Sequence, residues 1–353
     1  MSVGFDPVAS VRDTDTLVEP HDVEYQDGIA YVPGKGGTFA LVDVRAPEPR
    51  VLGALTDFEN AQTVLPVGNY ALVADDAGVH AVDCSTPTEP VVRATAADDG
   101  LTRINGVARW RSTLFCACKG GYVHAIDISA LPSLSVVGRY DADADAGLNS
   151  PHDIAVVRDH LVVPNQMQGT TPKLGAVRAI DTAANDLLDP AEWSASSTVS
   201  ASTMDGANRV VVRHPYLFVA NNYGHTVTAV DATDLAAMER VGECEVAARE
   251  PDGLALAGDY LLAGAEDTIE AFDVRDPTDP TSAAVHRFEQ NINAHDLEVV
   301  GDTVYLTGQG TAELHLLSLG GASGSDRLDA LHLEGSGVAT DLRVSHSLDA
   351  GPT

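Results

Sequence analysis

One pattern recurs along the whole chain: an apolar strand of five residues that, in every copy but the last, ends in aspartate. Successive copies end 40 to 54 residues apart, which is the length of one four-stranded propeller blade and too long for a leucine-rich repeat. The sequence therefore predicts an all-β, seven-bladed propeller of four-stranded antiparallel blades, forming a single domain over residues 1–353. The copies occupy residues 39–43, 79–83, 123–127, 177–181, 227–231, 269–273 and 314–318.

The remainder of each unit also fits a blade. A first strand meets a tight turn such as Asp27-Gly28, whose residues tolerate the positive φ of a two-residue hairpin, and a second apolar strand follows. After the aspartate, a corner rich in proline leads to a fourth, outer strand. We expect each aspartate to accept hydrogen bonds from N–H groups of that corner. The units begin near residues 21, 62, 105, 152, 208, 252 and 295.

This pattern resembles the LVIVD-repeat family, whose units carry such a strand followed by Asp, a small residue and Pro. The resemblance extends over roughly residues 21–320. It implies the propeller fold and is silent on activity, because one propeller architecture hosts enzymes, ligand binders and docking platforms.

Closure of the ring is open to two solutions. The outer strand of the seventh blade could be the N-terminal segment Val8–Arg12 or the later segment Arg327–Glu334. The segment around Thr340 repeats the pattern around Asp296, as if an eighth unit began and stopped. We expect seven blades, with one terminus clasping the other and residues 335–353 frayed.

Composition constrains the partners. The formal net charge is −31, the sequence pI is about 4.4, and only three of the 21 basic residues are lysine. This resembles proteins of salt-in halophilic archaea, whose carboxylate-rich surfaces stay soluble in molar salt. The charge argues against binding to nucleic acid or anionic membranes, which needs a basic surface. With no signal peptide or membrane span visible, we expect a cytoplasmic protein.

Motifs that define common active sites are absent from the sequence. Four cysteines show no CxxC spacing, so we expect small buried residues rather than a zinc or redox site. No GxSxG, HExxH, P-loop or dinucleotide fingerprint interrupts the repeats. Function must therefore come from positions that the repeat itself brings together.

One polar residue stands at the start of each predicted innermost strand. The family resemblance implies the usual propeller geometry, in which these starts line one mouth of the central channel, so the seven side chains should form a ring there. A solvated rim without a chemical role would also tolerate polar residues, and a ligand site is the alternative. The ring consists of His21, Gln62, Asn105, His152, Asn208, Asp252 and His295.

The three histidines of this ring suggest a metal site. Because the seventh blade adjoins the first, His295 and His21 should be neighbours, with His152 across the channel. Three imidazoles could hold a divalent or copper ion. The smaller hypothesis is a pair, His21 and His295, completed by Asp252 or water. If binding depends on neutral imidazoles, it should weaken below about pH 6.5.

The lysines give a second signal. Lys35, Lys119 and Lys173 all lie between second and third strands, in turns that open on the same mouth as the ring. With Arg209 beside Asn208, they would offset the surrounding carboxylates and admit an anion. Turns also tolerate surviving lysines, so chance placement is the alternative.

Two functions from different classes follow. The first is a binding or interaction propeller that captures a small anionic ligand or a protein partner at the channel mouth. The second is a metal- or histidine-dependent enzyme of lyase, isomerase or lactonase type that acts on an anionic, sugar-acid-like molecule. The family resemblance favours the first, and a stoichiometric bound metal would favour the second.

Overall fold

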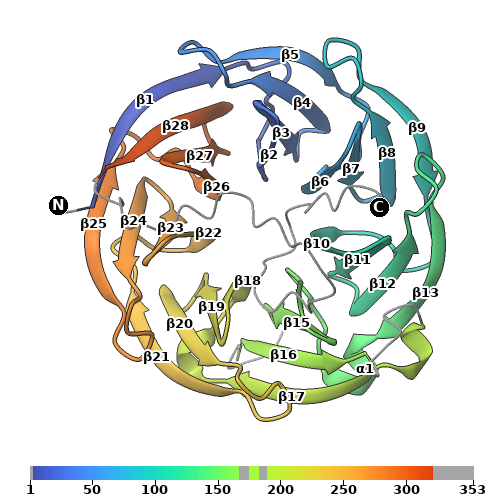
Figure 1. Ribbon diagram of the computed structural model, residues 1–353, viewed down its shortest axis with the longest axis vertical. Helices are drawn as coiled ribbons and strands as arrows, with labels where there is room; N and C mark the ends of the chain where they lie inside the picture. Colours follow the sequence, from blue (N-terminus) through green and yellow to red (C-terminus); the bar gives the residue numbers. More distant parts are fainter. Residues whose placement is uncertain (1–2, 167–174, 183–188, 321–353) are drawn as a thin grey trace, which may run out of the picture.

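The protein is described here by a computed structural model covering residues 3–166, 175–182 and 189–320. Its strands form seven four-stranded antiparallel sheets that stand like blades around one axis (Figure 1). Each innermost strand contacts the innermost strands of the two neighbouring blades, and β26 contacts β2, so the ring is closed. The prediction of a seven-bladed, all-β propeller is confirmed.

The strands run outward from the axis in chain order. The innermost strands are β2 (Glu24–Gln26), β6 (Thr63–Val67), β10 (Ile104–Trp110), β14 (Ala155–Val157), β18 (Ala207–Arg213), β22 (Pro251–Ala257) and β26 (Ala294–Val300). The second strands are β3 (Ile29–Gly34), β7 (Tyr70–Ala74), β11 (Thr113–Cys118), β15 (His160–Asn165), β19 (Tyr216–Asn221), β23 (Tyr260–Ala265) and β27 (Thr303–Gly308). The third strands are β4 (Thr38–Asp43), β8 (Val79–Asp83), β12 (Tyr122–Asp127), β16 (Ala176–Asp181), β20 (Thr226–Asp231), β24 (Thr268–Asp273) and β28 (Glu313–Gly320). The outer strands, from blade one to blade seven, are β5 (Arg50–Leu55), β9 (Val91–Ala96), β13 (Ser135–Asp141), β17 (Ser194–Ser200), β21 (Glu239–Glu245), β25 (Thr281–Arg287) and β1 (Gly4–Arg12).

The N-terminal strand closes the seventh blade. β1 pairs antiparallel with β28, from Gly4 opposite Gly320 to Arg12 opposite Glu313, with one irregularity near Pro7. In Figure 1, β1 lies beside β28 at the rim. Of the two segments that could fill this slot, the N-terminal one therefore does so. The segment 327–334, Thr340 and the expected frayed tail 335–353 lie outside the described residues.

The hydrophobic core is divided among the spaces between blades. Each of the seven buried apolar clusters combines residues from two neighbouring blades. Between blades three and four, for example, Phe115 packs against Trp193 with ring centroids 5.7 Å apart. β-branched and aromatic residues suit such sheet-on-sheet packing. Each blade thus buries apolar side chains against both of its neighbours.

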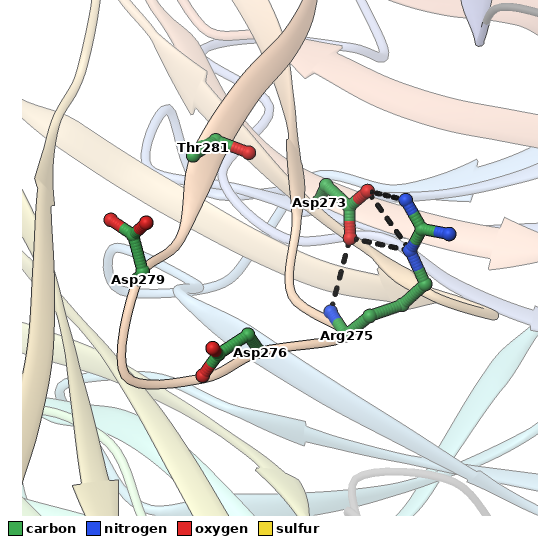
Figure 2. A pocket seen from close by; sticks show the side chains of 5 residues that line it. All are labelled: Asp273, Arg275, Asp276, Asp279 and Thr281. Carbon is green, nitrogen blue, oxygen red and sulfur yellow. Dashed lines mark hydrogen bonds and ion pairs between the residues drawn. The ribbon is translucent and has the colours of Figure 1, made fainter.

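The aspartates that close the third strands organise the corners as expected. Five of them accept a hydrogen bond from the backbone N–H two residues later, at 2.8–3.2 Å. Figure 2 shows the corner of blade six, where Asp273 also binds the Arg275 side chain. These five are Asp43, Asp83, Asp127, Asp231 and Asp273.

Helical structure in the described residues is limited to three short segments. They are α1 (Ala142–Ala146) and the 3₁₀ turns η1 (Pro190–Glu192) and η2 (Ser202–Met204). No helix in the described ranges is both long and apolar enough to cross a membrane. Cys116 and Cys118 are fully buried, and burial raises the pKa of both thiols, as expected for small core residues.

Candidate functional site

The seven polar residues of the predicted ring occupy equivalent places beside the axis, and we call them the axial ring. His21, Gln62 and His152 directly precede or closely flank the innermost strands β2, β6 and β14, whereas the other four lie within β10, β18, β22 and β26. Six of the seven are buried, and Asp252 is partly exposed. The alternative of a solvated rim does not fit this burial.

Local backbone geometry sets the direction of these side chains. In blades three, five, six and seven, the pairing of the first two strands shifts register at the ring residue, which places Asn105, Asn208, Asp252 and His295 on β-bulges. A bulge leaves one residue out of the ladder and re-aims its side chain. In these four blades, a β-bulge therefore sets the orientation of the ring side chain.

In all but one blade, a left-handed residue precedes the turn into the innermost strand. In six blades the residue two positions before the ring residue has a positive φ, which side chains other than glycine seldom adopt. Five of the six are not glycine, so the backbone is strained at this turn in those blades. The six residues are Glu19, Asn60, Arg103, Gly206, Glu250 and Asn293.

His21 and His295 form the closest pair of the axial ring. Their ring centroids are 3.8 Å apart. His21 Nδ1 lies 2.6 Å from the carbonyl oxygen of Gln62, and His295 Nδ1 lies 2.8 Å from that of His21. Burial lowers the pKa of both imidazoles well below 6.5, and the charges of Lys35 and Arg209 act in the same direction. Both histidines are neutral at pH 7.

The asparagines of the ring connect its remaining members. Asn105 Nδ2 lies 3.4 Å from His152 Nε2. Asn208 Nδ2 donates to Asp252 Oδ1 at 2.7 Å, and Asn222 Nδ2 donates to the same oxygen at 2.8 Å. Burial raises the pKa of Asp252 to about 6, although the charges of Arg209 and Lys35 oppose this rise. The ring thus contains a carboxyl group that titrates near neutral pH.

The aspartate after each ring histidine ties its blade to the next one. Each accepts a hydrogen bond from a backbone N–H of the following blade, which fits the structural role that the sequence favoured for it. The pairs are Asp22 with Val64 N at 3.0 Å, Asp153 with Val210 N at 3.0 Å, and Asp296 with Val23 N at 3.3 Å.

Blade five carries Arg209 where blades one, four and seven carry these aspartates. Its guanidinium lies 3.3 Å from Asp296 Oδ1, and both side chains are buried. Burial opposes the charge of Arg209, but Asp296, Asp153, Asp22 and Asp252 together raise its pKa. Arg209 is therefore a buried cation surrounded by carboxylates. It contributes positive electrostatic potential to the site and not a free hydrogen-bond donor.

Lys35 and Lys119 supply the partly exposed positive charge of the site. Burial lowers the pKa of Lys35, and it lowers the pKa of Lys119 to about 8, with Lys35 and Arg103 acting in the same direction. Burial also lowers the pKa of His152 well below 6.5, and the charge of Lys119 adds to this effect. The two lysines therefore lie close enough to the ring to affect its titration. Lys173, also predicted to overlook the ring, lies outside the described residues.

Four atoms of the axial ring are buried without a hydrogen-bond partner among the described residues. A buried polar atom without a partner costs about 1–3 kcal/mol, and native structures contain few of them. Four at one position of the repeat point to a bound molecule or ordered water. The atoms are His21 Nε2, Asn105 Oδ1, His152 Nδ1 and Asn208 Oδ1.

The three histidines are not brought together as one coordination group. Within the described ranges, no set of three or more His, Cys, Asp or Glu side chains has an arrangement that could hold a metal ion. His21 and His295 stack, whereas His152 contacts Asn105. Metal binding by His21, His152 and His295, and the role of a divalent or copper ion, stay predictions.

Asn222 is a site residue that the sequence analysis missed. It directly follows the second strand β19, just as Lys35 follows β3 and Lys119 follows β11. Residues at this position donate their backbone N–H to the residue two before the ring residue, as Lys119 does to Arg103 and Asn222 to Gly206. The turn position used to find the lysines would therefore also have found Asn222.

A hollow on the outer side of blade six lies apart from the axial ring. It has a volume of about 400 Å³ and is lined by residues of the corner between β24 and β25. Figure 2 shows Asp273 bound to Arg275, with Asp276 and Asp279 on the same loop. Asp276 accepts hydrogen bonds from Thr278, so this corner is accounted for by turn structure.

Comparison with known proteins supports the fold and part of the repeat. The LVIVD repeat profile matches residues 60–96 and 114–142, which span strands of blades two and three. No curated protein sequence matches the chain significantly.

Three solved structures that resemble the chain in fold have low sequence identity to it. The WD40 β-propeller domain of Doa1 superposes with a TM-score of 0.65 at 11% identity, covering 89% of this chain and 97% of that one. The computationally designed Ika8 protein has a TM-score of 0.59 at 11% identity, covering 89% and 99%. BamB from Moraxella catarrhalis has a TM-score of 0.56 at 12% identity, covering 89% and 97%. At these identities the likeness is one of fold alone.

Proposed function

We propose that the protein is a binding propeller that holds a small anionic ligand at the axial site, meaning the axial ring together with Lys35, Lys119 and Arg209. The observation that carries this proposal is the group of four buried polar atoms without partners, set beside two partly exposed lysines. Burial lowers the pKa of all three ring histidines, and the positive charges of Lys35 and Arg209 act in the same direction. A site with this field favours an anion over a cation.

The test removes the two lysines and compares the result with a variant of equal charge. In the Lys35→Ala/Lys119→Ala variant, we expect carboxylate affinity to fall at least tenfold by calorimetry at a fixed KCl concentration. The Arg93→Ala/Arg275→Ala variant loses the same charge at exposed corners of the rim, where both arginines bind aspartates. It should bind as the parent does. Equal loss in both variants would mean that net charge, and not the site, determines binding.

A protein partner could use the same cations through a carboxylate side chain or a C-terminal carboxylate. The titration panel therefore includes a short acidic peptide beside the small carboxylates. A peptide that binds more tightly than every small anion, and loses affinity in the double lysine variant, would identify the partner as a protein.

An enzyme is the second candidate, favoured by one observation. Asp252 has a pKa raised to about 6 and Lys119 one lowered to about 8, both close to the range in which general acids and bases work at neutral pH. A lyase, isomerase or lactonase reaction on a sugar-acid-like molecule would use such groups. Proton NMR of a uronate or lactone incubated with the protein tests this. Turnover that Asp252→Asn abolishes would establish the enzyme, and an unchanged spectrum would leave binding alone.

A further inference from the structure

The hydrogen bonds of the axial ring determine which of its atoms accept protons and which donate them. A backbone carbonyl can only accept, so the Nδ1 atoms of His21 and His295 must carry the hydrogen. Since both imidazoles are neutral, each Nε2 presents a lone pair. His21 Nε2 is buried and has no partner among the described residues. It is therefore an unused acceptor.

The same reasoning fixes the amide of Asn208. A carboxylate accepts, so Asn208 must point its Nδ2 toward Asp252, which leaves its Oδ1 buried and unpartnered in the described part of the chain. The contact between Asn105 and His152 Nε2 allows two assignments: Asn105 Nδ2 donates to a bare Nε2, or Asn105 Oδ1 accepts from a protonated Nε2. In both assignments the Asn105–His152 pair leaves one unused acceptor and one unused donor.

The free atoms of the ring are thus three acceptors and one donor. A simple anion such as acetate or phosphate offers acceptors, and it would satisfy only the lysines and the one unused donor of the Asn105–His152 pair. To satisfy His21 Nε2, Asn208 Oδ1 and the unused acceptor of that pair as well, the ligand must donate several hydrogen bonds. Hydroxyl groups do this without adding positive charge, which Lys35 and Arg209 would repel.

We infer that the ligand is a polyhydroxylated anion, whose acidic group faces Lys35 and Lys119 and whose hydroxyl groups donate to the ring acceptors. This inference rests on the proposed function, because it names the class of anion for the same site. A sugar carboxylate and a sugar phosphate share this chemistry. A site built to bind hydroxyl groups rejects an analogue without them, since its buried acceptors are then left unpaired.

The test compares ligands matched in charge and length. Gluconate and hexanoate are both six-carbon carboxylates, and only gluconate carries hydroxyl groups. We expect calorimetry to show gluconate binding at least tenfold more tightly than hexanoate. Glucose, which has the hydroxyl groups without the charge, should bind more weakly than gluconate. Glucose 6-phosphate in place of gluconate shows which acidic group the site prefers.

A variant identifies the acceptors. Asn208→Leu removes one acceptor and should lower the ratio of gluconate affinity to hexanoate affinity. Asn69→Leu, in the exposed hairpin between β6 and β7, is the matched control and should change neither. Should Asn208→Leu fail to fold, the comparison of gluconate with hexanoate on the parent protein still decides the inference.

The outcomes separate the inference from the proposal on which it rests. Gluconate and hexanoate binding equally, both weakened in Lys35→Ala/Lys119→Ala, would overturn the inference and keep the anion site. Glucose binding as tightly as gluconate, or no anion binding at all, would overturn the proposed function itself.

Discussion

Asp252 and Lys119 are the residues of the axial site whose charge changes close to neutral pH. Burial raises the pKa of Asp252 to about 6 and lowers that of Lys119 to about 8. Loss of either proton makes the site more negative by one charge. We therefore predict that anion affinity is highest below pH 6, falls as pH rises through 6, and falls again through 8. Calorimetry with gluconate between pH 5 and 9 measures both steps.

Two substitutions assign the steps. Asp252→Asn should remove the lower step, because the asparagine side chain, placed between Asn208 and Asn222, does not ionise. Lys119→Arg should remove the upper step, because arginine stays charged throughout this range. The expectation drawn from sequence was a loss of binding below about pH 6.5 as the histidines protonate. Burial lowers their pKa well below that value, so the structure moves this loss to lower pH.

For single residues, the sequence predicted which side chains form the axial ring but not what surrounds them. Aligning the units was enough to select the axial ring, because every blade places its first strand in the same register. The surroundings depend on contacts between blades that lie far apart in sequence. These contacts determine the burial of the ring residues, the imidazole tautomers and the ion pair between Asp296 and Arg209. Asp252 shows the difference, since its raised pKa comes from burial that a repeat pattern does not encode.

At the scale of strands, blade contacts depend on a few positions without a side chain. Gly106 follows the ring residue Asn105, where blade four carries Asp153. A Cβ atom on Gly106 would lie 2.5 Å from the Asp153 Cα, and backbone cannot move aside as a flexible side chain can. We predict that Gly106→Ala lowers the free energy of unfolding by about 1–3 kcal/mol, the usual cost of overpacking. Urea denaturation in high salt measures this.

Gly4 provides the control for this prediction. It lies in the outer strand β1, and a Cβ atom there would have no heavy atom within 4 Å. Gly4→Ala should leave stability nearly unchanged. If Gly106→Ala were equally neutral, the contact between blades three and four would be looser than the structure shows.

The strands themselves were predictable, whereas the partner of the last one was not. Alternating apolar residues, two-residue turns and the closing aspartate are local signals, and they identified blades one to six completely. The choice between residues 8–12 and 327–334 for the rim of blade seven depends on a pairing between opposite ends of the chain. Both segments have strand-like patterns, so only the observed ladder between β1 and β28 decides it.

For the whole molecule, the buried neutral histidines predict sensitivity to acid. The unfolded chain protonates His21, His152 and His295 near pH 6.5, whereas the folded protein does so only at lower pH. The unfolded state therefore binds more protons below pH 6.5, and stability is lost as pH falls. Each histidine contributes a slope of up to about 1.4 kcal/mol per pH unit. Asp252 acts oppositely between its ordinary pKa of 3.8 and about 6, but it is one group against three.

Urea denaturation between pH 7.5 and 5 at constant KCl tests this slope. The His21→Asn/His152→Asn/His295→Asn variant should have a smaller slope than the parent, whatever its absolute stability, and His124, His286 and His315, whose pKa burial also lowers, should account for part of what remains. A parent slope equal to that of the variant would mean that the three imidazoles titrate normally and are more hydrated than their burial indicates.

We expect salt to stabilise the whole molecule, although it weakens single ion pairs. Exposed pairs such as Arg93 with Asp83 and Arg287 with Asp267 weaken as salt screens them, but such surface ion pairs contribute little to stability. The 52 acidic residues against 21 basic ones give a net charge of −31, whose self-repulsion opposes the compact state. The screening length falls from about 10 Å at 0.1 M salt to about 3 Å at 1 M.

Because repulsion outweighs the few surface pairs, we predict that the melting temperature rises steeply between dilute and molar KCl. Sucrose, which stabilises compact states without screening charge, is the control and should give a smaller rise at dilute salt. A melting temperature that does not change with KCl would show that the carboxylates are too far apart to repel, and it would remove the interpretation of this composition as an adaptation to salt.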